Sequence, residues 1–399
     1  MKKAIAIFVT ILSVVTVKAQ LASDALRYSY IPQYGGTARA IGVGGSMGAI
    51  GGDFSTISTN PAGLATYRTG EFIFSPSYHG AKTTSLLDKG GQAETTQRFS
   101  KFSLDNLGLV FGNSGTETDK WKTRNFAIGF NRLQDFSSNI YYEGTTMGSI
   151  TSRFRDQANI DGLDPFESKL ADSTEAIFFS KSKNRYATDF EGNPAAGIYK
   201  SQVIETRGGV NEMVIAYAAN YQEKLQIGAT IGVPFIRYSE TKIYKEEDTR
   251  KEVPYFDKLQ FDQNLTTTGV GINAKIGIIA RPTKTIRLGV AVHTPTKYQM
   301  TDSYNNKLYY AFTDSLRYSN SAASPEGEFK YKLATPWRFI GSAGLIVGKS
   351  GFISADVEWA DYSKSNFTLE KEYIVDQNDV NQVIANRYKS ALNIRFGGE

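Results

Sequence analysis

The sequence predicts an all-β protein: a transmembrane antiparallel β-barrel that encloses an N-terminal plug segment, called here the hatch. Three observations predict this fold class. Large apolar residues alternate with small or polar ones from about residue 102 onward, an export signal opens the chain, and short connections between strands alternate with long ones. A period of two indicates an extended strand whose two faces meet different surroundings. The clearest run has Leu225, Ile227, Ala229, Ile231, Val233 and Phe235 on one face, against Gln226, Gly228, Thr230 and Gly232.

The export signal occupies residues 1–19. Lys2 and Lys3 form its basic start, an apolar stretch follows, and Val17-Lys18-Ala19 fits a cleavage site before Gln20. The chain has no cysteine, which excludes a disulfide framework and a lipid-modified N-terminus. Beyond the signal there is no run of about 18 apolar residues, which a spanning helix needs. We therefore expect export to the cell outer membrane of a Gram-negative bacterium.

Composition supports the same assignment. The chain has 24 Phe, 23 Tyr and 3 Trp, and outer-membrane barrels gather aromatic residues at both edges of the lipid layer. The net charge is only +5 over 399 residues, with Lys and Arg spread along the chain, so nothing indicates a nucleic-acid surface. A soluble β-sandwich would also alternate. It would not predict the export signal, the long strands or the asymmetry of the connections.

Ten strands are predicted behind the hatch. The hatch covers residues 20–66, which are rich in Gly and Ala and do not alternate, and the barrel covers residues 67–399. Bacterial barrels keep their periplasmic turns short. Since the even-numbered connections are the short ones, the first strand should rise from the periplasm and leave the hatch inside. The strands are expected near residues 70–79, 98–112, 124–142, 211–222, 224–245, 258–281, 284–301, 328–348, 351–370 and 386–399.

The third long loop and the end of the chain each leave two readings open. A helical pattern at residues 165–180 either folds over the mouth of the barrel or, as we favour, packs as a loop element. The last strand ends on Gly397-Gly398-Glu399, whereas such barrels usually end on an aromatic residue that the insertion machinery reads. Either a small ten-stranded barrel closes here, or the sequence is a fragment missing further strands, which we favour.

The strand phases sort the side chains into two faces. Apolar residues on one phase should face lipid, because a charge there would cost about 2–4 kcal/mol at the membrane midplane. Polar residues on the other phase should face the lumen. The outward set includes Phe126, Ile128, Phe130, Val270, Ile272, Ala274, Ile276, Ile278, Ile286, Leu288, Val290, Val292, Ile353, Val357 and Trp359, and the inward set includes Asn125, Asn131, Asn273, Lys275, Arg287, His293, Asp356, Glu358, Asn393 and Arg395.

The hatch and two later segments carry a family resemblance. The segments are Gly44-Gly45-Ser46-Met47-Gly48-Ala49, Asn60-Pro61-Ala62-Gly63-Leu64-Ala65, His293-Thr294-Pro295 and Ala334-Thr335-Pro336-Trp337-Arg338-Phe339. The chain thereby resembles the FadL/TodX family of outer-membrane transporters for long-chain fatty acids and other hydrophobic compounds. The resemblance implies a fourteen-stranded barrel, a hatch motif at Asn60, Pro61, Ala62 and Gly63, and a lateral wall opening beside an inward kink of an early strand. Ten predicted strands instead of fourteen is the main departure.

No motif points to catalysis, a metal or a cofactor. The glycine run misses the spacing of a dinucleotide loop, because Met47 stands where a glycine is needed. His79 and His293 are the only histidines, and the sequence does not place them together. Asp356 and Glu358 should share a lumen face about 6.6 Å apart, but pairing with Arg287, Arg338 or Arg395 explains them equally well. Without a convincing Ser/His/Asp set, we expect no enzyme.

The leading functional hypothesis is passive uptake of long-chain fatty acids or other hydrophobic small molecules, with lateral release into the membrane. The alternative is a FadL-like scaffold or surface receptor that binds protein partners. We expect a monomer that contacts outer-membrane lipid, a hydrophobic ligand and the insertion machinery, but no nucleic acid. The ligand should bind between the hatch and the early strands. The third strand is the candidate passage, because small side chains leave room on its inner face around Asn125, Ala127, Gly129 and Asn131.

Overall fold

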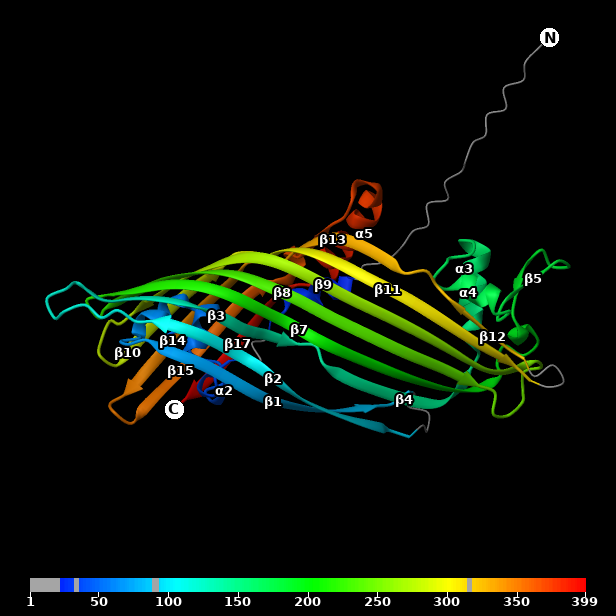
Figure 1. Ribbon diagram of the computed structural model, residues 1–399, viewed down its shortest axis with the longest axis horizontal. Helices are drawn as coiled ribbons and strands as arrows, with labels where there is room; N and C mark the ends of the chain where they lie inside the picture. The colour runs from blue at the N-terminus through cyan, green and yellow to red at the C-terminus, as the bar shows by residue number, and fades with distance from the viewer. Residues whose placement is uncertain (1–21, 32–35, 88–92, 314–317) are drawn as a thin grey trace, which may run out of the picture.

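The computed structural model describes residues 22–31, 36–87, 93–313 and 318–399, so the predicted export signal at residues 1–19 lies outside the described residues. The long strands lie side by side in one curved antiparallel sheet (Figure 1). The N-terminal segment packs against the inner face of this sheet. It is built of α1 (Ala22–Ser29), α2 (Ala38–Gly42) and two short 3-10 helices, η1 (Phe54–Ser58) and η2 (Pro61–Thr66).

Ten strands follow one another across the wall, in the number and order that the sequence predicts. Each pairs antiparallel with the next. Across the sheet they are β1 (Glu71–Ser85), β2 (Thr95–Phe111), β3 (Trp121–Asp135), β7 (Gly197–Tyr221), β8 (Leu225–Glu247), β9 (Phe256–Ala280), β10 (Ile286–His293), β14 (Arg338–Val347), β15 (Gly351–Asp361) and β17 (Ser390–Gly398).

Shorter strands extend this wall at one end. They are β4 (Ser138–Met147) on β7, β11 (Lys297–Phe312) on β9, β12 (Ser319–Ala323) and β13 (Gly327–Ala334) on β11, and β16 (Asn366–Thr368) on β13. Each of four predicted strands is therefore two, and in the predicted strand at 351–370 the short 3-10 helix η4 (Tyr362–Lys364) separates β15 from β16. Two of the breaks fall at Thr294-Pro295-Thr296 and Thr335-Pro336-Trp337, because proline offers no backbone N–H to a strand ladder. The remaining break, after Asp135, belongs to the site described below. The predicted strand at 211–222 also begins earlier, at Gly197.

The long loops contain more helix than the sequence suggests. The third loop holds α3 (Thr151–Ile160), α4 (Ser168–Ser173), η3 (Asp189–Gly192) and a separate hairpin of β5 (Phe178–Ser180) and β6 (Arg185–Ala187). These elements pack on the sheet: the Phe154 ring lies 5.3 Å from that of Phe261, and the Phe190 ring 5.1 Å from that of Phe256. A further helix, α5 (Ile374–Arg387), and η5 (Lys371–Tyr373) fill the last long loop, where no helix is predicted.

A belt of apolar side chains crosses the outer face of the wall. On β9, Ile276 is 63% exposed, whereas its neighbour Lys275 is 4% exposed. All the predicted outward residues are exposed or half-buried, and all the predicted inward residues are buried or half-buried. A soluble protein rarely exposes so broad an apolar surface, which suits contact with lipid. The belt includes Phe72, Phe74, Leu107, Leu109, Phe126, Ile128, Met213, Ile215, Ile227, Ile231, Ile272, Ile276, Leu288, Val290, Phe339, Leu345, Val357, Trp359, Ile394 and Phe396.

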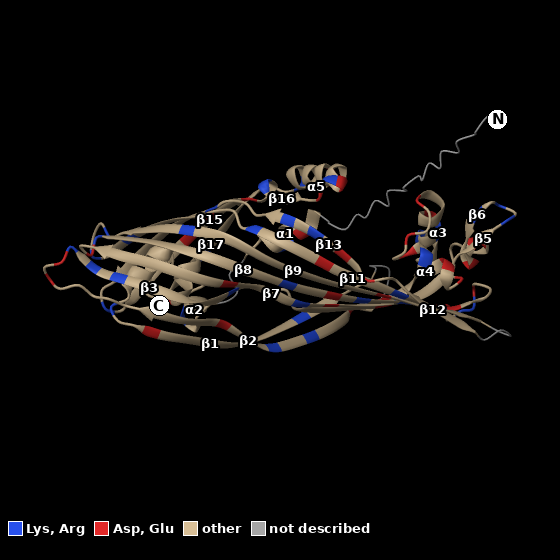
Figure 2. Cartoon of the chain, turned by 45° about the horizontal axis from the view of Figure 1, so that its top comes forward, with Lys and Arg blue, Asp and Glu red and all other residues tan. Residues whose placement is uncertain are grey.

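The polarity of the two faces reverses along the long strands. On β8, Phe235 is the last apolar residue of the outward phase before Arg237, and Ile236 and Tyr238 then face inward, each 3% exposed. Figure 2 shows Lys, Arg, Asp and Glu on the strand portions that run toward α3 and α4. Inside this portion an apolar core collects around α1, with Tyr28 packed edge-on against Phe136 and Tyr238. The sheet therefore leaves the belt and continues as a water-exposed extension with an apolar interior.

The reversal makes a matched pair of substitutions informative. Ile276→Arg places a charge within the belt and should destabilise the inserted protein by about 2–4 kcal/mol. Thr268→Arg places the same charge on the same outward phase of β9, beyond the belt beside Arg237, and should cost far less. Heat-modifiable migration of membrane extracts on gels measures the folded, inserted fraction of each variant. Equal losses from both substitutions would contradict this position of the belt.

The sheet is open in the part of the chain that the structure describes. β1 pairs only with β2 there, and β17 only with β15. Of the two readings of the chain end, closure as a ten-stranded barrel is therefore not observed. No helix among the described residues is long and apolar enough to span a membrane.

Candidate functional site

The hatch owes its compact form to side chains that cap its short helices. Thr37 accepts a hydrogen bond from the backbone N–H of Ala40 at the start of α2, and Asp53 accepts one from Ser55 at the start of η1. Asn60 caps η2 by accepting from the N–H of Ala62 at 3.2 Å. Each cap satisfies one of the backbone donors that a helix start leaves free. The hatch therefore folds as a chain of capped turns without a large core of its own.

The four predicted hatch residues, Asn60, Pro61, Ala62 and Gly63, are all buried. The Asn60 amide nitrogen donates to the carbonyl of Gly48 at 2.7 Å and to that of Ile278 on β9 at 3.3 Å. Asn60 thus joins two parts of the hatch to each other and to the wall. Gly63 lies so close to Thr56 that an added Cβ would stand 2.7 Å from its hydroxyl oxygen. The motif serves as the point where the hatch is fixed to the sheet.

Two wall glycines make this close approach possible. A Cβ on Gly277 of β9 would collide with the Asn60 side chain and stand 3.0 Å from the ring of Pro61. A Cβ on Gly228 of β8 would stand 2.5 Å from the carbonyl carbon of Pro61. Both glycines lie on the lumen phase of neighbouring strands, so their missing side chains form the depression that receives Pro61.

Polar side chains of the wall bind backbone carbonyls of the hatch. Asn125 on β3 donates from one amide group to the carbonyls of Leu64 and Tyr67, each at 2.8 Å. These two carbonyls lie at and just beyond the end of η2, where a helix leaves its last carbonyls without a full set of partners of its own. Four more wall residues, on β3, β8 and β10, do the same: Thr123 to Ala65, Thr230 to Ile57, Arg287 to Ile50 and His293 to Thr59.

A buried ion pair lies directly beneath the hatch. The ammonium of Lys275 is 2.5 Å from the carboxylate of Glu212, and the two side chains are 5% and 0% exposed. Glu212 also accepts from Ser58 of the hatch at 2.9 Å and from Asn273 at 3.1 Å. Such a pair is stable inside a protein only when its remaining hydrogen bonds are made, as they are here.

A second cluster of carboxylates on the lumen face shows which partners Glu358 and Asp356 bind. Glu358 accepts from Arg338 at 2.6 Å and from Arg395 at 3.1 Å. Asp356 instead accepts from the backbone N–H of Gly48 in the hatch at 3.1 Å, and Arg287 binds the hatch rather than a carboxylate. Charge pairing and contact with the hatch therefore account for both carboxylates.

His79 lies in a polar cluster on β1 and β2. The Ser77 hydroxyl is 2.9 Å from Nε2 of His79, and the Asp105 carboxylate lies 3.4 Å from the same nitrogen. A nucleophilic triad needs the serine and the carboxylate on opposite ring nitrogens, so this cluster is not one. No group of three or more His, Asp or Glu residues within the described ranges is placed to hold a metal ion.

The predicted passage residues all face inward, but the room they leave is filled. Asn125 and Asn131 bind the hatch, the latter by donating to Ser58 at 2.7 Å. Ala127 is fully buried, and a Cβ on Gly129 would stand 2.5 Å from the ring of Phe54 in the hatch. The small side chains of β3 therefore receive Phe54. An open space begins beyond Gly129, at Asn131, Arg132 and Leu133 of the same strand.

That space is a cavity of about 280 Å³ between the hatch and strands β2, β3 and β17. Apolar side chains form part of its wall, among them Ile41, Met47 and Leu133, and two guanidinium groups form another part, those of Arg132 and Arg395. Nε of Arg132 and Nη1 of Arg395 are buried without a hydrogen-bond partner among the described residues. Unpaired buried donors are costly and need an explanation. A ligand with an apolar body and an acidic end would satisfy both parts of this wall.

Beside the cavity the wall itself separates. The β2–β3 ladder covers only Asn106–Phe111 of β2 and ends at the pair Asn106–Asn131. Farther along, β2 continues with β1 on its other side, whereas β3 bulges after Arg132 and ends at Asp135. The chain then turns inward, and Phe136 joins the core around α1. A stretch without ladder hydrogen bonds, called here the slot, therefore separates β2 from the β3–β4 bend.

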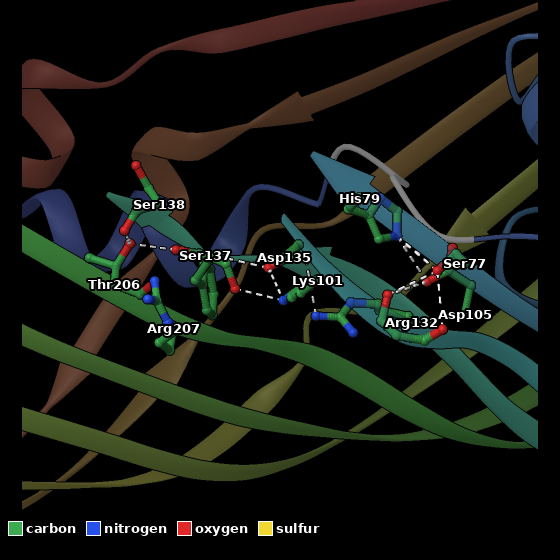
Figure 3. A network of polar contacts seen from close by, with 12 residues as sticks. Ser77, His79, Lys101, Asp105, Arg132, Asp135, Ser137, Ser138, Thr206 and Arg207 are labelled. Carbon is green, nitrogen blue, oxygen red and sulfur yellow. Dashed lines mark hydrogen bonds and ion pairs between the residues drawn. The ribbon is translucent and has the colours of Figure 1, made fainter. Parts of the chain in front are cut away.

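Figure 3 shows the side chains that line this slot. Lys101 of β2 reaches across it to Asp135 and Ser137, and Thr95 donates to the carbonyl of Tyr141 at the far end. Phe102, next to Lys101 on β2, is 81% exposed, so an apolar side chain lies on the outer surface beside the slot. The predicted passage residues lie on β3, which borders this slot, whereas sequence reasoning did not name Lys101, Arg132 or Asp135.

Neither a protein-family model nor a curated protein matches this chain. Among solved structures, the CymD monoaromatic hydrocarbon channel matches with 13% identity and a TM-score of 0.43, over 86% of this chain and 74% of that chain. The Pseudomonas putida toluene transporter TodX matches with 12% identity and a TM-score of 0.44, over 83% and 72%. The Ralstonia pickettii toluene transporter TbuX covers 92% and 98%, with 10% identity and a TM-score of 0.29. At this level of similarity the likeness carries no argument about function.

Proposed function

We propose that this chain is a passive outer-membrane transporter of hydrophobic small molecules, in which the hatch closes the lumen and the ligand leaves sideways through the slot between β2 and β3. The observation that carries the proposal is the position of the cavity. It lies against the hatch on one side and beside an unpaired stretch of lipid-facing wall on the other. An apolar solute gains about 25 cal/mol per Å² on leaving water. A lateral exit delivers it to lipid without a return to water.

The cavity wall favours an acidic amphiphile, such as a long-chain fatty acid, over a plain hydrocarbon. A hydrocarbon would cover Ile41, Met47 and Leu133 but offer no acceptor to Arg132 and Arg395, which line the same cavity and each carry a buried N–H without a partner among the described residues. A carboxylate would accept from them, and hydrogen bonds between ionised groups are about twice as strong as neutral ones. The chain of such a ligand would then lie along the apolar part of the cavity.

We expect the double variant Arg132→Gln/Arg395→Gln to reduce uptake of a fatty acid roughly tenfold, which corresponds to about 1.4 kcal/mol of lost binding. Uptake of the fatty alcohol of equal chain length should change little, because glutamine keeps most of the cavity's shape. Radiolabelled dodecanoate and dodecanol, supplied to cells that express each variant at equal surface level, provide the measurement. Arg68→Gln, which removes an exposed arginine near a short turn, is the matched control.

The same experiment tests the transporter role itself. Cells that lack this chain should take up dodecanoate more slowly than cells that have it; an empty plasmid should not change the slow rate, and a plasmid that expresses the chain should restore the fast one. Equal rates with and without the chain would contradict transport. Mass spectrometry of lipids that co-purify with the protein tests the ligand class directly, since an acidic amphiphile should be enriched over neutral lipids.

The extension beyond the belt favours a second candidate, a surface scaffold or receptor. Strands β7, β8, β9 and β11 carry polar side chains outward there and support the α3–α4 loop region. A protein partner would find a large water-exposed surface on this part. A stoichiometric partner that co-purifies, together with unchanged uptake in the deletion strain, would favour this role. Under either proposal we expect the chain to be a monomer that the insertion machinery assembles into the outer membrane.

A further inference from the structure

One ion pair closes the slot at the level where the lipid-facing surface ends. The Lys101 ammonium lies 2.7 Å from the Asp135 carboxylate and 2.6 Å from the Ser137 hydroxyl (Figure 3). The two charged side chains are 22% and 18% exposed. Because the β2–β3 ladder has already ended at Asn106–Asn131, side chains rather than backbone hydrogen bonds hold the two sides together here.

Asp135 is shared between two cations. Nη2 of Arg132 lies 3.3 Å from its Oδ2, whereas Oδ1, the oxygen that Lys101 contacts, also accepts from the backbone N–H of Ser137 at 2.9 Å. The nearby Asp105 is fully buried on β2, where it contacts His79 and Ser103 instead. One carboxylate thus serves both Lys101 and Arg132 at the slot.

Arg132 connects the slot to the cavity. Its guanidinium lines the cavity and carries an unpartnered Nε, while its Nη2 faces Asp135 in the slot. An acidic head group bound in the cavity therefore reaches the same guanidinium that Asp135 binds. Lys101 is the next positively charged side chain along the slot after Arg132.

We propose that Lys101 and Asp135 form a latch across the slot, and that the acidic head group of the ligand opens it by replacing Asp135 on Lys101 and Arg132. This inference rests on the proposed function and adds how the exit is opened and by which chemical group. The exchange gives the two cations the carboxylate of the ligand in place of Asp135, which keeps its hydrogen bond from the backbone N–H of Ser137, and the direct contact between the two chain segments is lost. A neutral ligand offers no such replacement, and the latch stays closed to it.

The latch predicts that Asp135→Asn abolishes discrimination at the exit. With the ion pair gone, the slot opens without an acidic ligand, and dodecanol uptake should rise roughly three- to tenfold, the range expected for a lost charged hydrogen bond. The ratio of dodecanoate to dodecanol uptake should approach one. Glu328→Gln, which removes the exposed ion pair with Lys330 on β13, should leave the ratio as it is. An unchanged ratio in a folded Asp135→Asn protein would overturn the proposal.

Covalent closure of the slot provides the second test. Because the chain has no native cysteine, only the introduced cysteines can react with the linker. Lys101→Cys/Asp135→Cys, joined by a short cleavable bis-maleimide on cells, should take up neither amphiphile until the linker is cleaved. The control Leu109→Cys/Ile128→Cys joins two residues that face each other where the ladder is intact, and its linker should change nothing.

The outcomes separate the latch from the function on which it rests. If the wild-type chain takes up neither dodecanoate nor dodecanol, the proposed function fails and the latch with it. If the wild-type chain transports dodecanoate and the cross-linked Lys101→Cys/Asp135→Cys protein does so equally well, the latch alone is refuted. Gel migration of the cross-linked protein shows in each case that it remains folded.

Discussion

Replacing Lys275 with methionine should lower the free energy of unfolding by about 3–5 kcal/mol, because Glu212 would remain buried and charged without its partner. Glu212 is fully buried beneath the hatch, and its remaining donors, Ser58 and Asn273, are neutral. Two neutral hydrogen bonds do not compensate for a buried negative charge. Unfolding in urea, followed by the loss of the fast-migrating folded band on gels, gives the change in stability.

The double variant Lys275→Met/Glu212→Leu provides the control. Apolar residues of similar size often replace a buried ion pair at little cost, so the double variant should recover much of the stability that the single variant loses. Its residual loss should reflect Ser58 and Asn273, which would then lack their acceptor. If the double variant is at least as unstable as the single one, the charge of Glu212 is not the cause of the loss.

Alternation was sufficient to predict the wall because it records what each strand face contacts. Ile276 and Lys275 are adjacent, yet one lies in the belt and the other beneath the hatch, and only a period of two separates them. The predicted strands at 284–301 and 328–348 ran through Pro295 and Pro336, although proline interrupts a ladder and marks the place of both breaks. Helix α5 was missed because only Ile384 along it is fully buried, which leaves a weak periodic signal.

The slot was missed although the sequence carries a trace of it. Asn131 and Leu133 keep the inward phase of β3, and a continuous strand would then place the odd-numbered Asp135 inward. The structure buries Phe136 instead, so one step of the alternation is lost between Leu133 and Phe136. A phase shift of this kind indicates a bulge or a bend. Interpreted as a bend, the phase shift between Leu133 and Phe136 would have located the end of β3.

The contacts between the hatch and the wall could not be predicted from the sequence, for a different reason. Asn60 binds the carbonyl of Ile278, and Asp356 the N–H of Gly48. These partners lie hundreds of residues apart, and their pairing follows from how the sheet curves around the hatch. The hatch motif predicted a plug, whereas the individual hydrogen bonds depend on the three-dimensional path.

Deleting residues 36–66 should convert the protein from a closed to a leaking one. The deletion removes the hatch backbone that Asn125, Thr230, Arg287 and His293 bind. Those side chains are polar, so water that enters the emptied lumen can satisfy them, and the lipid-facing belt is untouched. The wall should therefore still insert. Cells that express the deletion should become several-fold more sensitive to large hydrophilic antibiotics, which an intact outer membrane excludes.

A graded series distinguishes loss of the plug from loss of the wall. Asn60→Ala removes the hydrogen bonds to Gly48 and Ile278 but keeps the rest of the hatch, so its leak should be smaller than that of the deletion. Gly277→Val should push Pro61 away from β9 and give a similar partial leak, because its side chain would occupy the space of Asn60. Gly341→Val adds the same bulk to a wall glycine with nothing within 4 Å of its would-be Cβ, and it should leak no more than wild type. If the deletion variant fails to insert while both hatch point variants insert and remain tight, then the hatch is part of the supporting wall and the lumen is closed by other residues.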